Sequence, residues 1–197
     1  GRVVMNAQAK DALLSTVLNN DGVIRARSLE SRNGEIWLGG GSSGVVSVTG
    51  TLDASGTEAG QAGGTVKVLG DKVGLLAGAK LDVSGDAGGG AVLVGGEFQG
   101  KNPDVQNAFR TYVGPDATIK ADAITSGNGG KVIVWADDVT RYYGSISARG
   151  GSQSGNGGFV EISSKGSLEF RGSVNLDAPA GKTGTLLLDP LDITIAN

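Results

Sequence analysis

An internal repeat is the feature that most constrains how this chain can fold. Six times, a glycine is followed by a short run in which apolar residues alternate with other residues. The first inward positions of these runs are Ile36, Val66, Val92, Val132, Val160 and Leu186. Successive positions are separated by 30, 26, 40, 28 and 26 residues. Repeats of this length are typical of proteins in which one supersecondary unit stacks on the next.

A second run interleaves with the first and carries two inward columns. One column is aliphatic and the other is mostly small: Ile24, Leu52, Leu81, Ile119, Ile146 and Val174, then Ala26, Ala54, Val83, Ala121, Ala148 and Leu176. A looser third strand lies between the two runs, at 45–48, 73–76, 139–143 and 168–170. Three short strands per repeat with glycine at the corners predict a parallel β-helix whose equivalent residues stack about 4.8 Å apart. Residues 1–197 are therefore expected to form one all-β solenoid of about six coils.

Two segments interrupt the repeat. Between Asn6 and Asn20, apolar residues recur at helix-like spacing and the next two residues, Asp21 and Gly22, provide a stop signal. This pattern predicts a short N-terminal helix over 6–20 that lies against the first coil. The 40-residue step holds extra residues, which predict a surface insertion over 99–116. Loops of this kind often carry function.

Composition narrows the range of functions. Of the 197 residues, 36 are glycine and none is cysteine or histidine. Without those two side chains the chain cannot build Ser-His-Asp or Cys-His catalysis, a thiolate or imidazole zinc site, or a disulfide. A net charge of −3 gives no general attraction for nucleic acid, and no apolar run is long enough to span a bilayer. We therefore expect no nucleic-acid partner and no membrane insertion.

Carboxylates are the remaining candidates for catalysis, because parallel β-helices also include polysaccharide lyases and hydrolases that use them, often with Ca²⁺. Asp53 and Asp82 should lie one coil apart near Lys120, and the adjacent pair 137–138 lies close to Arg141. Neither set brings three carboxylates to one point. We predict that the chain is not an enzyme and that it has no metal site and no cofactor.

The glycine-rich corners suggest ligand loops but do not match them. Residues 85–90 do not reproduce the tandem Gly-Gly-x-Gly-x-Asp pattern of calcium-binding β-rolls. Residues 127–130 and 155–158 have the glycine content of a phosphate loop, but strands follow them and not helices. They predict turns with positive φ.

An apolar stripe occupies outward positions of the first run, at Trp37, Leu93, Ile133, Trp135, Phe159 and Leu187. Such a stripe marks either a binding surface or a face that other segments cover. As a binding surface, it would be a platform for sugar rings or a partner protein, with Trp37, Ile133, Trp135 and Phe159 as the ligand-binding residues. We favour the second interpretation, in which a neighbouring domain or the insertion covers the stripe. If the insertion covers it, Phe109 or Tyr112 would pack on the stripe.

Several motifs together carry a resemblance to a known family. They span Gly127 to Ala136, Gly144 to Gly151, Gly155 to Ser163 and Gly184 to Pro190, with an opening stretch from Asp11 to Ile24. In this order they resemble the repeats of filamentous-haemagglutinin-type exoproteins of two-partner secretion, which are large surface adhesins of Gram-negative bacteria. The resemblance implies a right-handed parallel β-helix, export through a dedicated outer-membrane β-barrel transporter, and roles in adhesion, aggregation, biofilm formation and virulence.

One departure from the family pattern bears on the transporter. The family's N-terminal secretion domain carries an Asn-Pro-Asn type motif, whereas Asn102-Pro103 in the insertion is the one Asn-Pro pair of this sequence. The resemblance therefore implies a segment that follows the secretion domain, with transporter contacts made mainly elsewhere. We expect a non-catalytic stalk or adhesive module, secreted or at the cell surface, that meets a host-cell surface or extracellular polysaccharide. The alternative is a carbohydrate-binding or polysaccharide-cleaving β-helix fragment.

Overall fold

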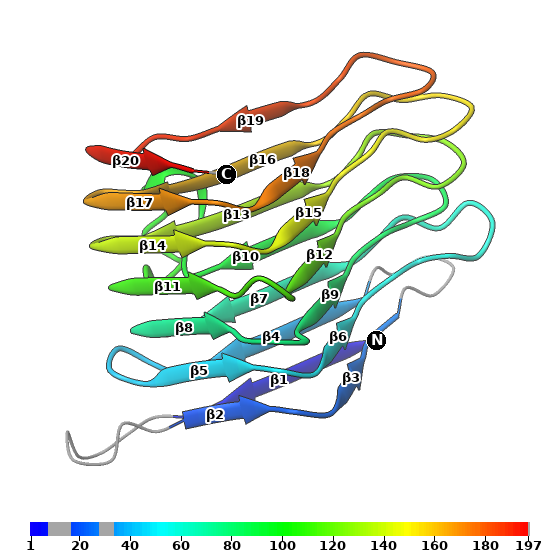
Figure 1. The fold of residues 1–197 in the computed structure, drawn as a ribbon. Helices are drawn as coiled ribbons and strands as arrows, with labels where there is room; N and C mark the ends of the chain where they lie inside the picture. The colour runs from blue at the N-terminus through cyan, green and yellow to red at the C-terminus, as the bar shows by residue number, and fades with distance from the viewer. Residues whose placement is uncertain (8–16, 28–33, 197) are drawn as a thin grey trace.

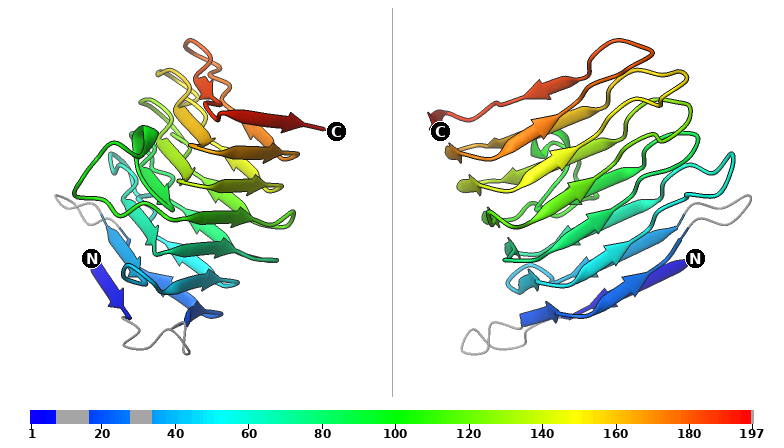
Figure 2. Two further views of the ribbon diagram at one scale, coloured as in Figure 1. Left: turned by 90° about the vertical axis from the view of Figure 1, so that its left-hand side faces the viewer. Right: turned by 45° about the vertical axis from the view of Figure 1, so that its right-hand side comes forward.

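Three parallel β-sheets wind around one hydrophobic core in the computed structural model of the chain (Figure 1). The structure describes residues 1–7, 17–27 and 34–196. Each of the first six coils contributes one strand to each sheet, and a last, partial coil adds a strand to two of them, so that neighbours in a sheet come from successive coils. The two further views show the coils stacked along one axis (Figure 2). The predicted all-β parallel solenoid of about six coils is confirmed.

The strands of each sheet follow chain order along the stack. Sheet A contains β1 (Arg2–Asn6), β4 (Glu35–Gly39), β7 (Thr65–Leu69), β10 (Ala91–Val94), β13 (Lys131–Ala136), β16 (Phe159–Ser164) and β19 (Thr185–Leu187). Sheet B contains β2 (Val17–Asn20), β5 (Val45–Val48), β8 (Lys72–Leu75), β11 (Arg110–Val113), β14 (Val139–Tyr142), β17 (Ser167–Phe170) and β20 (Asp192–Ile195). Sheet C contains β3 (Val23–Arg25), β6 (Thr51–Asp53), β9 (Lys80–Asp82), β12 (Thr118–Lys120), β15 (Ser145–Ser147) and β18 (Ser173–Asn175).

The register follows the predicted columns. In sheet A, Ile36 pairs with Val66, and the ladder continues through Val92, Val132, Val160 and Leu186. In sheet C the aliphatic column likewise pairs from Ile24 through to Val174. A slip of one residue would turn every inward side chain to solvent, so the alternation itself fixes the register.

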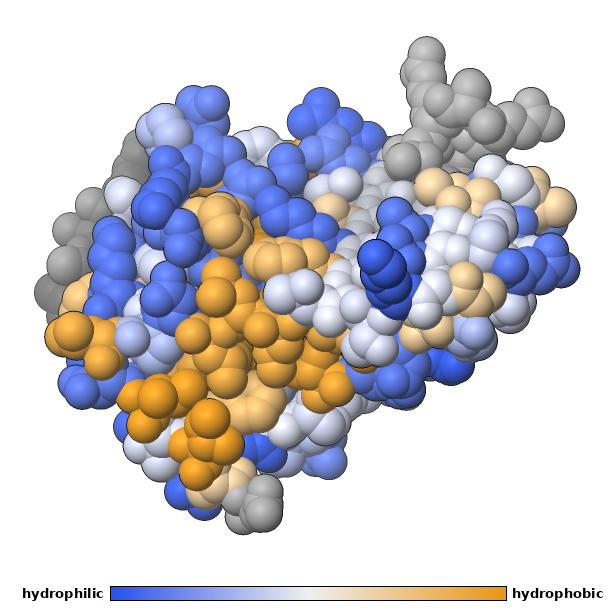
Figure 3. All heavy atoms as spheres, turned by 90° about the horizontal axis from the view of Figure 1, so that it is seen from above, coloured by the Kyte–Doolittle hydropathy of each residue, from blue (hydrophilic) through white to orange (hydrophobic). Residues whose placement is uncertain are grey.

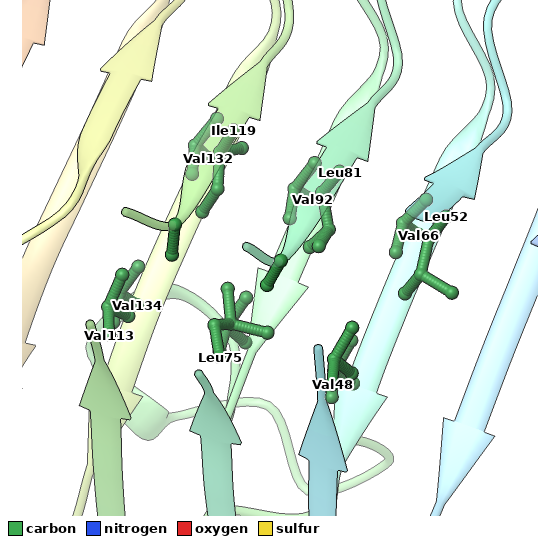
Figure 4. Close-up of a cluster of buried hydrophobic side chains, with 14 of the residues drawn as sticks. Val48, Leu52, Val66, Leu75, Leu81, Val92, Val113, Ile119, Val132 and Val134 are labelled. Carbon is green, nitrogen blue, oxygen red and sulfur yellow. The ribbon is translucent and has the colours of Figure 1, made fainter. Parts of the chain in front are cut away.

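The core is a set of aliphatic stacks that run along the axis. Figure 4 shows Leu52, Leu81 and Ile119 in line in sheet C, facing the side chains of the other two sheets. The stack residues of the middle coils are almost fully buried; Leu81, for example, is 1% exposed. Each fully buried Val, Leu or Ile stabilises the fold by roughly 1.5–3 kcal/mol, which makes these stacks the main source of stability.

Glycines stack at the corner that precedes sheet A, and close packing explains most of them. A Cβ on Gly90, Gly130 or Gly158 would overlap the carbonyl oxygen of the equivalent glycine one coil earlier. None of the three has a positive φ angle, so the predicted turn geometry is wrong for Gly130 and Gly158. It is right for Gly127 and Gly155, whose φ angles are +88° and +112°. The high glycine content therefore serves mainly the close approach of successive coils.

The predicted helix over 6–20 is wrong at both of its ends. Asn6 ends strand β1, and Val17–Asn20 form strand β2, which pairs with β5 in sheet B. Residues 8–16 of that prediction lie outside the described residues. Leu18 and Asn20 are both buried and alternate with exposed Asn19, which is a strand pattern. The solenoid thus gains an extra strand in sheet A and another in sheet B before the first repeat that the sequence showed.

The insertion predicted over 99–116 lies earlier in the sequence than expected. Its residues 110–113 form β11, the sheet B strand of that coil, which pairs with β8 and β14. The excursion instead runs from the end of β10 to Phe109 and contains a 3-10 turn, η1 (Phe98–Gly100). This turn is the one helical element among the described residues, and none of their helices is long and apolar enough to cross a membrane. We call residues 95–109 the strap.

The C-terminal end of the stack is apolar. Viewed from above, orange side chains gather over the last coil (Figure 3). Leu186, Leu191, Ile193 and Ile195 are the large apolar residues exposed there, and Leu191 is 82% exposed. The strands β18, β19 and β20 form the outer edge of their sheets at this end.

Candidate functional site

The outer face of sheet A is covered by the strap. Beneath it, Leu93, Ile133 and Trp135 form a small buried cluster outside the main core, with Phe159 half-buried against it. The ring of Phe98 in η1 meets the ring of Phe159 edge to face, with centroids 5.8 Å apart. Gly100 lies so close to the indole of Trp135 that a Cβ there would overlap the ring. The part of the apolar stripe from Leu93 to Phe159 is therefore a second packing interface, whereas Trp37 and Leu187 lie outside this cluster.

A buried carboxylate fastens the strap to sheet A. The backbone N–H of Gln99 donates to both carboxylate oxygens of Glu161, at 3.2 and 3.1 Å, although Glu161 belongs to a strand two coils further along sheet A than the start of the strap. Gln99 has a φ angle of +53°, which an L residue rarely adopts and which aims this N–H at sheet A. Glu161 is completely buried, and burial raises the pKa of its carboxyl, while the bonds from Gln99 and Ser163 oppose that rise.

Polar contacts extend the fastening on both sides of Glu161. The Gln99 side-chain amide donates to Asp189 at 3.0 Å, and Asp189 in turn donates its N–H to the Ser163 hydroxyl. At the start of the strap, Glu97 accepts from Lys131 at 3.0 Å and from the Asn102 amide. The Asn102 and Lys131 bonds lower the pKa of Glu97. The strap thus contacts strands from several successive coils.

Trp135 is held by its ring nitrogen as well as by packing. Its indole N–H donates to Asp137 at 3.2 Å, and the same carboxylate oxygen accepts from Asn107 of the strap. Lys165 forms an ion pair with Asp137 at 2.9 Å. Buried indole N–H groups need a partner, and Asp137, which also accepts from Asn107 of the strap, supplies one.

The four residues predicted as a ligand platform differ in exposure. Ile133 is fully buried and Trp135 is 3% exposed, so with the strap in place neither offers a surface to a ligand. Phe159 and Trp37 are partly exposed. Phe109 and Tyr112, the residues predicted to cover the stripe, are 47% and 37% exposed, and Phe98 packs on Phe159 instead.

Of the carboxylates predicted as the catalytic alternative, Asp53, Asp137 and Asp138 form ion pairs, and Asp82 accepts a hydrogen bond from the Ser84 N–H. Asp53 and Asp82 are register partners, as expected, and Lys120 follows on the next strand. Burial raises the pKa of Asp53, but hydrogen bonds from Ser55 and Arg27 outweigh it and lower the pKa overall.

The pair at 137–138 separates in the structure. Asp138 accepts a hydrogen bond from Arg110 at 2.9 Å. Asp137 instead accepts one from Trp135 and forms an ion pair with Lys165. The two carboxylates therefore do not share a partner. Within the described ranges, no three acidic side chains come together as a possible metal site.

A groove on the outer face of sheet B is a hollow that the sequence did not predict. It has a volume of about 440 Å³ and crosses the strands β5, β8, β11 and β14; its lining includes Lys72, Gly74, Leu76, Arg110, Tyr112 and Arg141. Sequence reasoning missed it because Arg110 and Tyr112 were assigned to the insertion. The alternation of Arg110 and Tyr112 with Thr111 and Val113 was the available signal.

Comparison with known proteins gives a structural neighbour. No family model and no curated protein matches the chain. Among solved structures, the fold is similar to the HMW1 secretion domain from Haemophilus influenzae, with a TM-score of 0.62 and 25% sequence identity. The match covers 99% of this chain and 49% of that one, so the chain spans about half the length of its neighbour.

Proposed function

We propose that this chain is a non-catalytic stalk or adhesive module of a large exported protein of the two-partner secretion type. The observation that carries the proposal is the unbroken register of three parallel sheets, combined with the likeness to the HMW1 secretion domain over nearly the whole chain. Stacked coils make a rigid rod whose length grows with each repeat. The right-handed winding that the family resemblance implies is part of the proposal.

The same argument supports the location and partners. A segment of this type is secreted or displayed on the surface of a Gram-negative bacterium, and an outer-membrane β-barrel transporter exports it. It contributes to adhesion, aggregation, biofilm formation and virulence through a host-cell surface or extracellular polysaccharide. Its place after the secretion domain is supported by the missing Asn-Pro-Asn motif. The neighbour, itself a secretion domain, makes placement within such a domain the competing outcome.

An export assay tests this proposal. The chain is fused behind a two-partner secretion domain and produced with the matching transporter in a laboratory Gram-negative host, and surface display is measured by antibody binding. We expect display of the fusion and none of the chain without the secretion domain. Display of the chain alone would show that it contains the transporter signal and would contradict the placement. Retention of the fusion inside the cell would contradict the proposal as a whole.

A deletion series tests the rod. Removing residues 36–65 takes out one coil in register, so the shortened chain should fold and melt as one unit. Removing residues 36–50 takes out half a coil, misaligns the columns and should unfold the neighbouring coils. Circular dichroism distinguishes the two; equal melting curves would contradict the modular stalk.

A turnover assay tests the non-catalytic part. The purified chain is incubated with several polysaccharides, with and without Ca²⁺, and cleavage is followed by chromatography. We expect no products. Cleavage that is lost in Asp53→Ala or Asp138→Ala would establish the enzymatic alternative.

A further inference from the structure

The groove on sheet B owes its depth to one glycine. Ser47, Gly74 and Tyr112 are register partners on three adjacent strands and share one outward column. Because Gly74 has no side chain, the column has a gap between Ser47 and Tyr112. Leu76 lies next to this gap, with its Cδ2 3.2 Å from the position that a Cβ on Gly74 would take. The floor is backbone, and the walls are side chains from neighbouring coils.

The charged residues that line this groove are all cations. Lys72 and Arg110 are register partners in one outward column, and Arg141 neighbours Tyr112 in the other. Their side chains are 52%, 61% and 61% exposed. Each has an acidic neighbour that is not part of the lining, namely Asp71, Asp138 and Glu169. The lining itself therefore carries cations only, and each of them is partly neutralised by an acid just outside the groove.

The two arginines keep binding capacity beyond these ion pairs. Arg110 contacts Asp138 through Nε at 2.9 Å, and Arg141 lies 3.8 Å from Glu169 through its Nε. A guanidinium has five N–H donors in a planar fork, which suits bidentate binding of a carboxylate. Both groups can hold their own acidic neighbour and still bind an anion in the groove.

Tyr112 supplies a flat apolar surface next to both arginines, because Arg110 precedes it by two residues on β11 and Arg141 is its register partner on β14. It is 37% exposed and is braced from the side by Tyr143, whose ring centroid is 5.6 Å away. A braced, half-exposed tyrosine offers a ring face for stacking and a hydroxyl for hydrogen bonding. A sugar ring has the matching chemistry, because its C–H face stacks on aromatic rings and its edge carries hydroxyl groups.

We propose that this groove binds an acidic glycan, a chain of sugar rings that carry carboxylates. One ring stacks on Tyr112 over the gap at Gly74, and its carboxylate binds Arg110 and Arg141. Lys72 interacts with the next acidic group along the chain. The inference does not depend on the stalk function, because a rod can export and fold correctly whether or not this groove has a ligand.

Calorimetry of the purified chain tests the proposal with a hyaluronan hexasaccharide, in which glucuronic acid alternates with N-acetylglucosamine. The matched probe is a chitin hexasaccharide, which has no carboxylate. We expect the acidic probe to bind at least tenfold more tightly, and its affinity to fall as salt rises. Equal binding of the two sugars, absence of binding to either, or equally tight binding of a hexaglutamate peptide would each overturn the proposal.

Variants locate the binding to the groove. Arg110→Gln and Arg141→Gln should each weaken binding of the acidic hexasaccharide about tenfold, and Tyr112→Ala should do the same. Gly74→Val fills the gap with a residue that strands favour and leaves every charge in place, so it should abolish binding without changing the circular dichroism spectrum. Arg25→Gln removes a cation of similar exposure, 63%, that lies on sheet C outside the groove, and this variant should bind like the unmodified chain. Loss of binding in Arg25→Gln, or normal binding in Gly74→Val, would overturn the assignment.

Discussion

The outer faces of sheets A and B follow the same alternation, but the outward apolar residues are buried on sheet A and exposed on sheet B. On sheet A, outward Leu93, Ile133 and Trp135 are buried beneath the strap. On sheet B, outward Leu76 and Tyr112 stay exposed around an open groove. The difference comes from one excursion of the chain and not from the repeat itself. In a solenoid, an insertion can therefore decide which face is closed and which stays available to a partner.

Removing the strap should erase this contrast and has the largest expected effect. Ala108 donates its N–H to the Gly95 carbonyl, so residues 97–107 can be replaced by two glycines without moving β10 or β11. The cluster would become exposed, at a cost of roughly 5 kcal/mol from three large apolar side chains. Hydrophobic-dye fluorescence should rise, and Trp135 should become quenchable by iodide. An unchanged dye signal with an intact β-sheet spectrum would contradict the covering role.

Matched aromatic substitutions on the two faces should differ strongly. Trp135→Ala removes a buried ring and a hydrogen bond, so we expect a loss of about 3–5 kcal/mol in the free energy of unfolding. Tyr112→Ala removes a partly exposed ring, and the loss should be below about 1 kcal/mol. Urea unfolding of both variants measures the difference. Similar losses would mean that the two faces are equally buried.

A pH series on Glu161→Gln sharpens the comparison at the strap. The folded-state pKa of Glu161 is raised, so the folded chain holds a proton that the unfolded chain releases near pH 4.3. Its contribution to stability is therefore fully present below that pH and is lost as pH rises through the folded-state pKa. The effect of Glu161→Gln on the free energy of unfolding should therefore be more favourable at neutral pH than at pH 4.

The control for this prediction is Glu169→Gln on sheet B, a carboxylate that is 29% exposed and pairs with Arg171. Thermal melts at several pH values should show the shift for Glu161→Gln only. The same pH trend in both variants would contradict a special role for the buried carboxylate.

The smallest expected effect is on the ion pairs of sheet B. Arg110→Gln breaks the ion pair with Asp138. Because the Arg110 and Asp138 side chains are 61% and 34% exposed, the free energy of unfolding should fall by less than about 0.5 kcal/mol. Salt should reduce even that difference. A loss of 2 kcal/mol or more on thermal unfolding would show that the pair is part of the packing and not a feature of an open face.

The sequence predicted the register well because the inward columns repeat the same residue types. The ladder from Val92 to Val132 holds across the 40-residue step that contains the strap. Strand β11 was missed because its inward residue Thr111 is polar; its hydroxyl donates to the Trp135 carbonyl, a contact that no periodicity reveals. The helix over 6–20 failed because four residues, Val17–Asn20, fit either period.

The candidate sites were harder to predict than the fold. Covering of the apolar stripe was expected, but the covering residue is Phe98 and not Phe109 or Tyr112. That choice depends on how the strap turns at Gln99 and on its bond to Glu161. A glutamate at an outward strand position is ordinarily solvated, so nothing in the pattern marked Glu161 as buried.

The direction of the sheet hydrogen bonds has a mechanical consequence. In all three sheets they join one coil to the next and thus run along the stack. A force that pulls the two ends of the chain apart loads them a few at a time, so coils should peel off singly. Each would release about 90 Å for 26 residues of extended chain. The strap crosses this order, because the Gln99 bond to Glu161 ties β16 to a segment from an earlier coil. Peeling from the C-terminal end must break that bond before β16 can detach, so the strap resists the loss of coils within the rod.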